Sequence, residues 1–336
     1  MKKKNCFLIA EIGLSHEGSA GIAKSYIDLA SSLGFDAIKF QTHNAEDESS
    51  KQELFRSKIF FQDKTRFDYW KRTSFSDDIW LFLKKYCDKK KIVFISSAFS
   101  EKSLKVLKKI GQKYWKIPSG EVTNLILIEE IAKLKKHIFL STGMSTYTEI
   151  REAIKIIRKY HNKITLMHCT SEYPSKPENV NLQLINTMSK KFNIDVGYSD
   201  HTGELSTCLI ANYLGAVAAE IHITYSKKMF GADASSSIEL NNLQEWVRSM
   251  KFVDTIKNQS LSKDQISKKL IFMKKLFEKS LIASENLKKG EKFKPKDFIL
   301  RKPGNGLSAK YAQKLIGKKI KKNYLKNQLI SKNEIF

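Results

Sequence analysis

The chain has 336 residues, which is enough to bury a large core and suits one large domain with a smaller one. Its hydrophobic fraction of 41% excludes a disordered or low-complexity protein. The sequence has no run of about 18 apolar residues, so no membrane span is predicted. The net charge of +25 raises the question of nucleic-acid binding. However, 53 of the 60 basic residues are Lys, and they are spread over every segment rather than gathered on one face. We therefore expect a folded protein that binds neither nucleic acid nor a membrane.

The beginning of the chain, MKKKNCFLIAEIG, does not have the pattern of a signal peptide. Glu11 interrupts the short apolar run, and no small-residue cleavage site follows it. The four cysteines, Cys6, Cys87, Cys169 and Cys208, are scattered without CxxC pairing, which suits a reducing compartment better than a disulfide framework. These features predict a cytoplasmic protein.

Eight short apolar runs recur along the first two thirds of the chain, each ending in polar residues. Runs of this kind are typical of buried parallel strands. The predicted strands are FLIAEIG (7–13), DAIKFQT (36–42), KIVFISSAF (91–99), YWKIPSGE (114–121), HIFLSTGM (137–144), ITLMHCT (164–170), DVGYSDHT (195–202) and AVAAEIHIT (216–224).

Amphipathic helical segments separate these runs. Ser76 is a predicted N-cap, the segment from Ser100 to Gly111 has both a start and a stop signal, and Thr146 with Glu149 forms a capping box. Eight strands that alternate with helices predict an α/β protein with a (β/α)₈ TIM barrel, because parallel strands need helical crossovers. A doubly wound open sheet is the main alternative.

The composition changes after the predicted barrel, which we place at 1–256. A Lys-rich helical linker is expected at 257–277, followed by a small β-rich domain at 278–336. In this tail NLKKGEKFKPKDF (286–298) aligns with NYLKNQLISKNEI (323–335) at an offset of 37 residues, from 286 to 323. Gly290 meets Asn327, Phe293 meets Ile330 and Asp297 meets Glu334, which predicts two related turn units in a pseudo-symmetric domain.

Polar residues close each predicted strand, and the carboxyl ends of barrel strands form the active-site face of such folds. Lys39 and Lys116 lie inside apolar runs, where an unpaired ammonium group would be costly. Two lysines surrounded by hydroxyl groups suit a substrate that carries phosphate and carboxylate. The converging set is Glu11, Lys39, Gln41, Ser96, Ser97, Lys116, Ser119, Glu121, Ser141, Thr170, Ser171, Tyr173, Ser199, Asp200, His201 and His222.

His201 and His222 close the last two predicted strands. Neighbouring neutral imidazoles can share a divalent cation, but two separately hydrogen-bonded histidines explain the same spacing equally well. Ser199, Asp200 and His201 are consecutive, so they do not predict a catalytic triad, because alternate side chains of a strand point to opposite faces.

These motifs together resemble the bacterial sialic acid synthases, over essentially the whole chain. That family condenses phosphoenolpyruvate with an N-acylated amino-sugar to give a nine-carbon nonulosonic acid and phosphate. The resemblance is carried by AEIGLSHEG (10–18), IKFQTH (38–43), WKIPSGE (115–121), LSTGM (140–144), HCTSEYP (168–174), GYSDHT (197–202), EIHIT (220–224), MFGAD (229–233) and KPGNG (302–306).

The resemblance implies a TIM barrel followed by a small antifreeze-like (SAF, or β-clip) domain. It also implies a divalent metal, most often Mn²⁺ with Mg²⁺ or Co²⁺ as options, held by His201 and His222. Glu121, Glu11 and Lys116 carry over as catalytic residues. The substrate-binding residues that carry over are Lys39, Gln41, Ser97, Ser119, Ser141, Ser171, Tyr173, Ser199, Asp233 and, from the tail, Arg301 or Lys302.

Family members are dimers in which the tail of one subunit covers the barrel of the other, so a domain-swapped homodimer is expected. The family has Arg where this chain has Lys302, which changes a bidentate contact into a point charge or moves the contact to Arg301. Two other functions remain open from the sequence. One is a related phosphoenolpyruvate-dependent aldol-type synthase that acts on a sugar phosphate, and the other is a basic, non-enzymatic binding protein.

Overall fold

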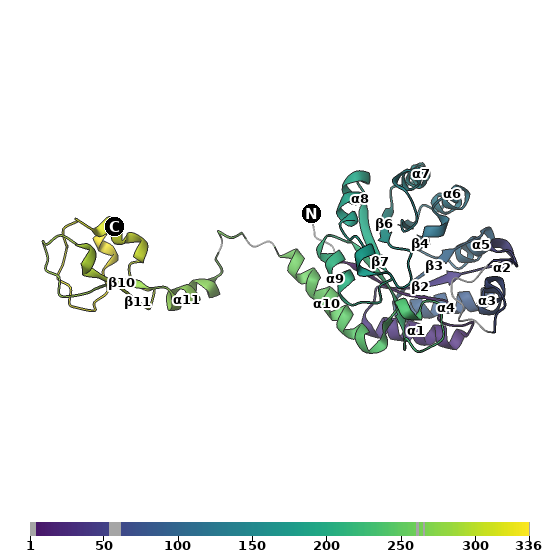
Figure 1. Ribbon diagram of the computed structural model, residues 1–336, viewed down its shortest axis with the longest axis horizontal. Helices are drawn as coiled ribbons and strands as arrows, with labels where there is room; N and C mark the ends of the chain where they lie inside the picture. Colours follow the sequence, from purple (N-terminus) through teal and green to yellow (C-terminus); the bar gives the residue numbers. More distant parts are fainter. Residues whose placement is uncertain (1–4, 54–61, 260–261, 265, 336) are drawn as a thin grey trace. The chain divides into compact units, whose positions relative to one another are not determined.

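The computed structural model describes residues 5–53, 62–259, 262–264 and 266–335. The chain divides into two compact units, Met1–Gln259 and Ser260–Phe336, both drawn in Figure 1. Each unit has its own hydrophobic core and is described separately below.

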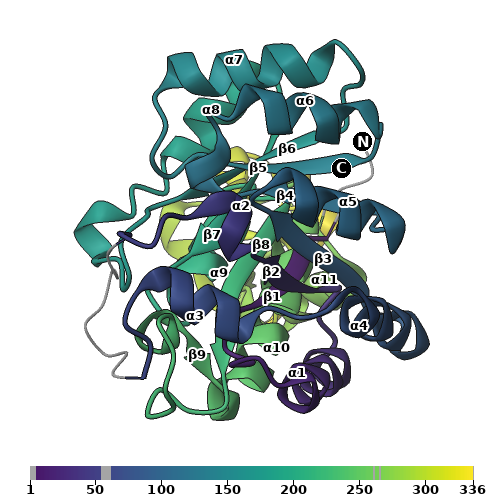
Figure 2. The ribbon, with the colours of Figure 1, turned by 90° about the vertical axis from the view of Figure 1, so that its right-hand side faces the viewer.

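The first unit is built on eight parallel strands that pair in chain order and close when β1 pairs with β8. The helices that connect them surround the strands, as Figure 2 shows. This is the predicted TIM barrel, and closure excludes the open doubly wound sheet. The strands are β1 (Phe7–Gly13), β2 (Ala37–Thr42), β3 (Val93–Ala98), β4 (Tyr114–Ile117), β5 (His137–Ser141), β6 (Ile164–Cys169), β7 (Asp195–Asp200) and β8 (Ala218–Thr224).

Each predicted run contains its strand, but several predicted runs are too long at the carboxyl end. The run at 114–121 ends as a strand at Ile117, because Pro118 has no amide hydrogen to donate to a neighbouring strand. Residues Ser119–Glu121 then form a single 3₁₀ turn, η1. The polar residues of these runs therefore lie both in the last part of the strands, as Lys39 and Lys116 do, and in the segments that follow them, as Ser119 and His201 do.

The helices begin where the sequence provides caps. The Ser100 hydroxyl accepts a hydrogen bond from the amide of Ser103, and Thr146 forms the predicted capping box with Glu149. Ser76 precedes its helix without a side-chain capping bond. The helices that cover the barrel are α1 (Ala20–Leu33), α4 (Asp77–Lys90), α5 (Glu101–Lys109), α6 (Leu125–Lys133), α7 (Tyr147–Arg158), α8 (Leu184–Phe192), α9 (Ser206–Tyr213) and α10 (Leu240–Asn258).

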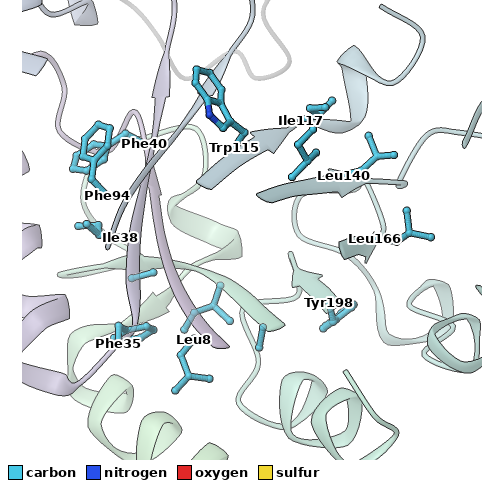
Figure 3. Close-up of a cluster of buried hydrophobic side chains, with 14 of the residues drawn as sticks. Leu8, Phe35, Ile38, Phe40, Phe94, Trp115, Ile117, Leu140, Leu166 and Tyr198 are labelled. Atoms are coloured by element: carbon cyan, nitrogen blue, oxygen red, sulfur yellow. The ribbon is translucent and has the colours of Figure 1, made fainter. Parts of the chain in front are cut away.

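Alternate residues of each strand point outward and form the main core against the helices. Figure 3 shows this outward set, which includes Phe40, Phe94, Trp115, Leu166 and Tyr198. Burying such side chains stabilises the fold by about 1.5–3 kcal/mol each. The residues between them point into the barrel, where a lower, apolar layer is formed by Ile9, Ala37, Ile95, Phe139, Met167 and Ala218.

A segment between β2 and α4 adds two short helices, α2 (Ala45–Glu48) and α3 (Arg66–Thr73). Phe67, Tyr69 and Trp70 of α3 pack with Ala45 in a small separate core. Leu14, Phe230 and Ala232 lie against that core. The added helices are therefore fixed to the loops that follow β1 and β8 at the carboxyl end of the barrel.

The second unit contains α11 (Lys268–Phe277) and an antiparallel pair of strands, β10 (Ser280–Ala283) and β11 (Phe298–Arg301). Most of its remaining backbone forms turns, 3₁₀ turns and isolated bridges. It is the β-rich domain that the sequence predicts. Its core consists of Leu281, Ala283, Leu287, Phe293, Leu307, Leu315, Ile320, Tyr324 and Ile330.

The internal repeat of this unit is confirmed by its hydrogen bonds. Gly290 and Asn327 both adopt left-handed φ angles, +93° and +67°. The amide of Gly290 donates to the carbonyl of Ile320, and the amide of Asn327 donates to the carbonyl of Ala283. The two bonds interchange under the 37-residue offset, so the two halves of the unit are related by a pseudo-two-fold axis.

The matched side chains of the repeat have equivalent environments. Phe293 and Ile330 are both 1% exposed, and Asp297 and Glu334 each close a 3₁₀ turn with a buried carboxylate.

Across the part of the chain that the structure describes, no helix is both long enough and apolar enough to traverse a bilayer.

Candidate active site

Above the apolar layer, the inward-pointing positions of the barrel carry charge. Lys39 Nζ lies 2.7 Å from Glu11 Oε2 and 3.8 Å from Glu220 Oε1. Lys116 Nζ donates to both oxygens of Glu220, at 2.7 and 2.9 Å, and lies 3.4 Å from Ser199 Oγ. The four charged side chains of β1, β2, β4 and β8 thus alternate in sign within one buried layer.

Burial and ion pairing have opposite effects on the pKa values of the carboxyl groups in this layer. Burial raises the pKa of Glu11, although Lys39 partly offsets the effect. Burial would also raise the pKa of Glu220, but Lys116 and Lys39 outweigh it and hold that pKa well below the usual range. The two carboxylates and two ammonium groups have a formal charge of zero, so the layer can accept an anion only when charges rearrange or a cation is added.

A cavity of about 730 Å³ opens above this layer. Its walls come from the carboxyl ends of the strands and from the loops that follow them, as the position of the predicted site requires. The sequence-predicted residues that line it are Glu11, Lys39, Gln41, Lys116, Ser119, Glu121, Ser141, Ser171, Tyr173, Ser199, His201, His222 and Asp233.

One wall of the cavity is a close group of small polar side chains. Gly143 donates its amide hydrogen to Ser119 Oγ at 3.2 Å, and Ser119 Oγ lies 3.3 Å from Cys169 Sγ. A Cβ atom added to Gly143 would come within 2.5 Å of Ser171 Oγ and 2.7 Å of Cys169 Sγ. Glycine is therefore required here, and its absence of a side chain leaves several hydroxyl groups facing one small volume.

His201 and His222 also line the cavity and lie together, with ring centroids 5.4 Å apart. His201 Nδ1 lies 2.7 Å from the carbonyl oxygen of Thr170, and since a carbonyl only accepts, Nδ1 carries the proton. Burial, reinforced by His222, lowers the pKa of His201 to about 4. The ring is therefore neutral at pH 7, and its Nε2 lone pair is available to a ligand.

Both histidines also contact other cavity residues. The Tyr173 ring packs on His201 with centroids 4.2 Å apart, and His222 Nδ1 lies 3.8 Å from Asp233 Oδ2. Over the described ranges, no group of three or more His, Cys, Asp or Glu side chains is arranged to hold a metal ion. A metal at this pair would need its other ligands from substrate or water.

Glu121 lies at the edge of the cavity on η1. Its Oε2 accepts a hydrogen bond from Asn124 Nδ2 at 2.8 Å, and burial raises its pKa above the ordinary value. A half-buried carboxyl group with a raised pKa can exchange a proton near neutral pH more readily than an exposed one.

The consecutive residues Ser199 and Asp200 point to opposite faces of β7, as strand geometry predicts. Ser199 faces the cavity and donates to Glu220 Oε1 at 3.3 Å. Asp200 faces outward, where its carboxylate accepts hydrogen bonds from Tyr198 Oη and from Thr202. No triad is formed by these residues.

Besides Asp200, three predicted site residues of the barrel do not line the cavity, namely Ser96, Ser97 and Thr170. Ser97 is fully buried beside Lys116 in the strand register and does not line the cavity. Among the described residues its hydroxyl group has no hydrogen-bond partner. Arg301 and Lys302 belong to the second unit, where Lys302 Nζ lies 5.1 Å from the centre of the Phe277 ring. Their part in the site stays a prediction.

The sequence analysis missed several residues of the cavity. Glu220 lies inside an apolar strand, so the argument applied to Lys39 and Lys116 could have found it. His43 lies just beyond a predicted strand and was at most a reserve ligand from the sequence, and no local pattern marks Glu48, Trp70 or Phe99. The missed lining residues are His43, Asp47, Glu48, Glu53, Arg66, Tyr69, Trp70, Phe99, Asn124, Cys169 and Glu220.

The closed barrel, the buried lysines and the hydroxyl-lined cavity define an enzyme of the TIM-barrel class with a polar cavity at the carboxyl ends of its strands. Comparison with known families is more specific. The chain belongs to the NeuB family, whose model matches residues 26–262, and residues 278–335 match the SAF domain. The resemblance found in the sequence is thereby confirmed, together with the nature of the tail.

Two curated relatives illustrate the similarity. The N,N'-diacetyllegionaminic acid synthase of Campylobacter jejuni is 34% identical over 97% of this chain and 99% of its own. The human N-acetylneuraminate-9-phosphate synthase is 32% identical over 74% of this chain and 70% of its own. Both are named synthases, and neither name describes a non-enzymatic binding protein.

A solved structure agrees with the sequence comparison. The N-acetylneuraminic acid (sialic acid) synthetase of Leptospira borgpetersenii superposes with a TM-score of 0.71 and 31% identity, covering 81% of this chain and 91% of the other. The family's barrel therefore has the architecture described above.

Proposed function

We propose that this protein is a nonulosonic acid synthase that condenses phosphoenolpyruvate with an unphosphorylated N-acyl amino-sugar and water. The products are a nine-carbon 2-keto acid and phosphate. The observation that carries the proposal is the buried layer of Lys39 and Lys116, each held by a carboxylate, below a cavity that is lined by the neutral His201 and by His222. The names of the relatives supply the substrate class.

Phosphoenolpyruvate would bind between the lysines and the hydroxyl wall. Ser119, Ser141, Ser171 and Ser199 all line the cavity and supply short donors, and Lys116 supplies charge. Gly143 leaves the room for a phosphoryl group that a Cβ atom would take. Ser97, fully buried next to Lys116, would join this set if its neighbour moves toward the ligand.

The residues present fit a divalent cation. His201 presents a neutral ring whose other nitrogen is fixed by the carbonyl of Thr170, the usual arrangement of a metal-binding histidine. Because the four buried charges sum to zero, a trianionic substrate also needs added positive charge. We propose Mn²⁺, with Mg²⁺ or Co²⁺ as alternatives, held by His201 and His222, where it would polarise the sugar aldehyde as a Lewis acid.

The amino-sugar would occupy the wider part of the cavity. Glu11, Gln41, Tyr173 and Asp233 line the cavity and offer acceptors and donors to the hydroxyl and amide groups of the sugar. Glu11 is held by Gln41 Nε2 at 2.9 Å and by Lys39, so its oxygens point in a defined direction. The legionaminic acid synthase among the relatives supports a diacetamido-trideoxyhexose as acceptor, with N-acetylmannosamine as the other candidate.

The proposed reaction balances without an external acid or base. A bond forms between C3 of phosphoenolpyruvate and the aldehyde carbon, and Glu121 protonates the aldehyde oxygen. Water then attacks C2 and returns a proton to Glu121. The bond between C2 and the phosphate oxygen breaks with the electron pair leaving on phosphate, which takes the remaining hydroxyl proton as C2 becomes a carbonyl. Lys39, Lys116 and the serines stabilise the redistributed charge.

We also propose a homodimer in which the tail of one subunit covers the barrel of the other, so that Arg301 or Lys302 contacts the amino-sugar. Support comes from α11, which leaves apolar side chains exposed over its length, among them Leu270, Phe272 and Phe277 at 58–60%. Light scattering of the full chain would test this, and a monomer at micromolar concentration would contradict it.

A cytoplasmic location is proposed because all four cysteines are free thiols.

The function is tested by phosphate release. We expect inorganic phosphate from phosphoenolpyruvate only when Mn²⁺ and an N-acyl amino-sugar are both present. A folded protein that releases no phosphate with any acceptor would contradict the proposal, and release without an acceptor would indicate a different reaction.

The second candidate is a synthase that acts on a phosphorylated amino-sugar. The name of the human relative favours it, and Arg66 at the cavity wall could meet a second phosphate, although it pairs with Glu53 at 2.8 Å. Comparing kcat/KM for phosphorylated and unphosphorylated forms of the same sugar separates the two candidates.

A further inference from the structure

A continuous chain of polar contacts joins the edge of the cavity to its buried charged layer. Glu48 Oε2 lies 3.0 Å from His43 Nδ1, and His43 Nε2 lies 3.1 Å from Gln41 Oε1. Gln41 Nε2 donates to Glu11 Oε1 at 2.9 Å, and Glu11 Oε2 pairs with Lys39. The proposed reaction uses Gln41, Glu11 and Lys39, but nothing in it accounts for His43 or Glu48.

The direction of each bond is fixed by chemistry. A carboxylate only accepts, so the amide nitrogen of Gln41 must face Glu11 and its oxygen must face His43. An amide oxygen also only accepts, so His43 Nε2 carries a proton. Glu48 is a second acceptor on the other side of the ring, so Nδ1 carries a proton as well. A ring that donates from both nitrogens, to the Glu48 carboxylate and to the Gln41 oxygen, satisfies both contacts.

The surroundings of His43 suit a cation. Its ring lies between Trp70 and Phe99, with centroids 4.5 and 4.2 Å away and interplanar angles of 12° and 21°. A cation over an aromatic face is stabilised by the ring quadrupole, most strongly over Trp. His43 and Glu48 have side-chain exposures of only 4% and 5%, so the pair is shielded from solvent.

We propose that the His43–Glu48 ion pair positions Gln41 and, through it, Glu11 for the amino-sugar. This inference rests on the proposed function. His43 and Glu48 are positioning residues, because they act on Gln41 and not on the reacting atoms. Their effect is to select one of the two orientations of the Gln41 amide, which differ only in the exchange of its oxygen and nitrogen.

Loss of the His43 proton would break this selection. A ring protonated only on Nδ1 presents a lone pair to the Gln41 oxygen, so the amide turns over and its oxygen faces the Glu11 carboxylate. A ring protonated only on Nε2 presents a lone pair to Glu48. Either tautomer leaves one buried polar group without a partner, which costs free energy. A ring that donates from only one nitrogen should therefore weaken the binding of the amino-sugar and leave that of phosphoenolpyruvate unchanged.

Other charged groups bear on the same ring. Glu48 on α2 favours the charged form, and His16 in the loop after β1 lies near enough for His43 to lower its pKa. Arg66 stacks on the Trp70 ring 4.4 Å from its centre, and Glu11 lies beyond Gln41. The negative charge of Glu48 adds to the effect of burial that raises the pKa of Glu121. All of these groups remain unchanged in the His43 variants below, and Glu48 changes only in E48Q.

The test uses two variants of His43 with a matched control. H43F keeps an aromatic ring between Trp70 and Phe99 but removes both donors. H43Q places an uncharged donor near the position of Nε2 and cannot titrate near neutral pH. The control, H137F, makes the same change in a histidine at the amino end of β5, at the opposite end of the barrel.

In the full-length, Mn²⁺-loaded protein, we expect H43F to raise KM for the amino-sugar about tenfold or more while KM for phosphoenolpyruvate stays unchanged. H43Q should restore much of the amino-sugar affinity, because its amide nitrogen can still donate to Gln41 Oε1. H137F should match the wild type in both constants. Equal KM values for H43F and wild type, or an equal loss for both substrates, would overturn the inference.

A spectroscopic measurement keeps the inference separate from activity. In protein labelled with ¹⁵N-histidine, the resonances missing from H43Q belong to His43, and we expect both nitrogens to have imidazolium shifts at pH 7. E48Q should convert them to those of a neutral Nε2–H ring, because the new amide can donate to Nδ1. A neutral ring in the wild type would overturn the inference. An inactive wild type with an imidazolium His43 would overturn the proposed function instead.

Discussion

The interior of the barrel contains two layers that are built in the same way and filled differently. In the lower layer the inward positions are apolar, with Ile9, Phe139 and Met167 packed together. In the upper layer, one inward position further along the strands, Glu11, Lys39, Lys116 and Glu220 occupy equivalent places. The strand alternation is identical, and only the chemistry of the side chains changes.

The difference separates what holds the barrel together from what the barrel does. Burying apolar side chains stabilises the fold, whereas burying charges carries a desolvation penalty that pairing only partly offsets. A stack of apolar residues would close the barrel at least as well as the charged layer. The upper layer is therefore best explained by the binding of an anionic substrate.

The largest expected effect follows from Lys116→Met in the upper layer. The variant loses a charge that would bind phosphate and leaves Glu220 with Lys39 3.8 Å away as its remaining ion pair. We expect kcat/KM to fall about a thousandfold, and the free energy of unfolding to drop by about 3–5 kcal/mol. Phosphate release and urea denaturation measure the two quantities.

The double variant K116M/E220M then isolates the role of charge. Replacing both partners by apolar groups should recover most of the lost stability and none of the activity. Recovery of activity in the double variant would show that this layer serves only the fold.

The next effect concerns the two histidines. His201→Ala should weaken Mn²⁺ binding by roughly a hundredfold or more and abolish metal-dependent phosphate release. The fraction of free Mn²⁺, followed by electron paramagnetic resonance, measures this directly. His137→Ala is the control and should leave binding unchanged. Metal-dependent activity that survives in H201A would show that the cation is held elsewhere.

A substitution in the lower layer should reduce stability and leave activity unchanged. Phe139→Ala removes a ring that packs with Phe7 and Tyr114, with centroids 6.0 Å from each. We expect a loss of about 3–5 kcal/mol in the free energy of unfolding, while KM and kcat of the folded fraction stay at wild-type values. A change in KM for phosphoenolpyruvate would mean that the two layers are not independent.

The smallest effect is a change in pH dependence. Burial lowers the pKa of His16 to about 3, against about 6.5 in an unfolded chain. Between these values the unfolded state holds a proton that the folded state lacks, so stability falls as pH decreases. His16→Phe should reduce that slope by about 1.4 kcal/mol per pH unit below pH 6.5. An unchanged slope in denaturation experiments at pH 4.5–6.5 would contradict the buried, neutral His16.

The sequence predicted the barrel well because its signals are local. The eight apolar runs each contain a strand, and the caps at Ser100 and Thr146 are where the helices begin. The carboxyl ends of the runs were overextended, since polar residues that follow a strand are hard to distinguish from those that end it. The turn repeat was visible because Gly290 and Asn327 are residue types that adopt left-handed angles.

The site was predicted in part, and the missing part depends on tertiary structure. Glu220 could have been found, because a carboxylate in an apolar strand needs a buried partner just as Lys39 does. Trp70 and Glu48 could not, since they reach the cavity only because α2 and α3 fold back over the barrel. The contacts of His43 with Glu48 and Gln41 also depend on the fold of α2 over the barrel.

The most direct test of the central claim is mass spectrometry of the product. Purified protein with phosphoenolpyruvate and Mn²⁺ would be given a panel of N-acyl amino-sugars, phosphorylated and unphosphorylated. We predict a product equal to one unphosphorylated acceptor plus pyruvic acid, formed in equal amount to the phosphate released and absent without metal. A folded, metal-loaded protein that forms such a product with no member of the panel, or only with a phosphorylated sugar, would contradict the account.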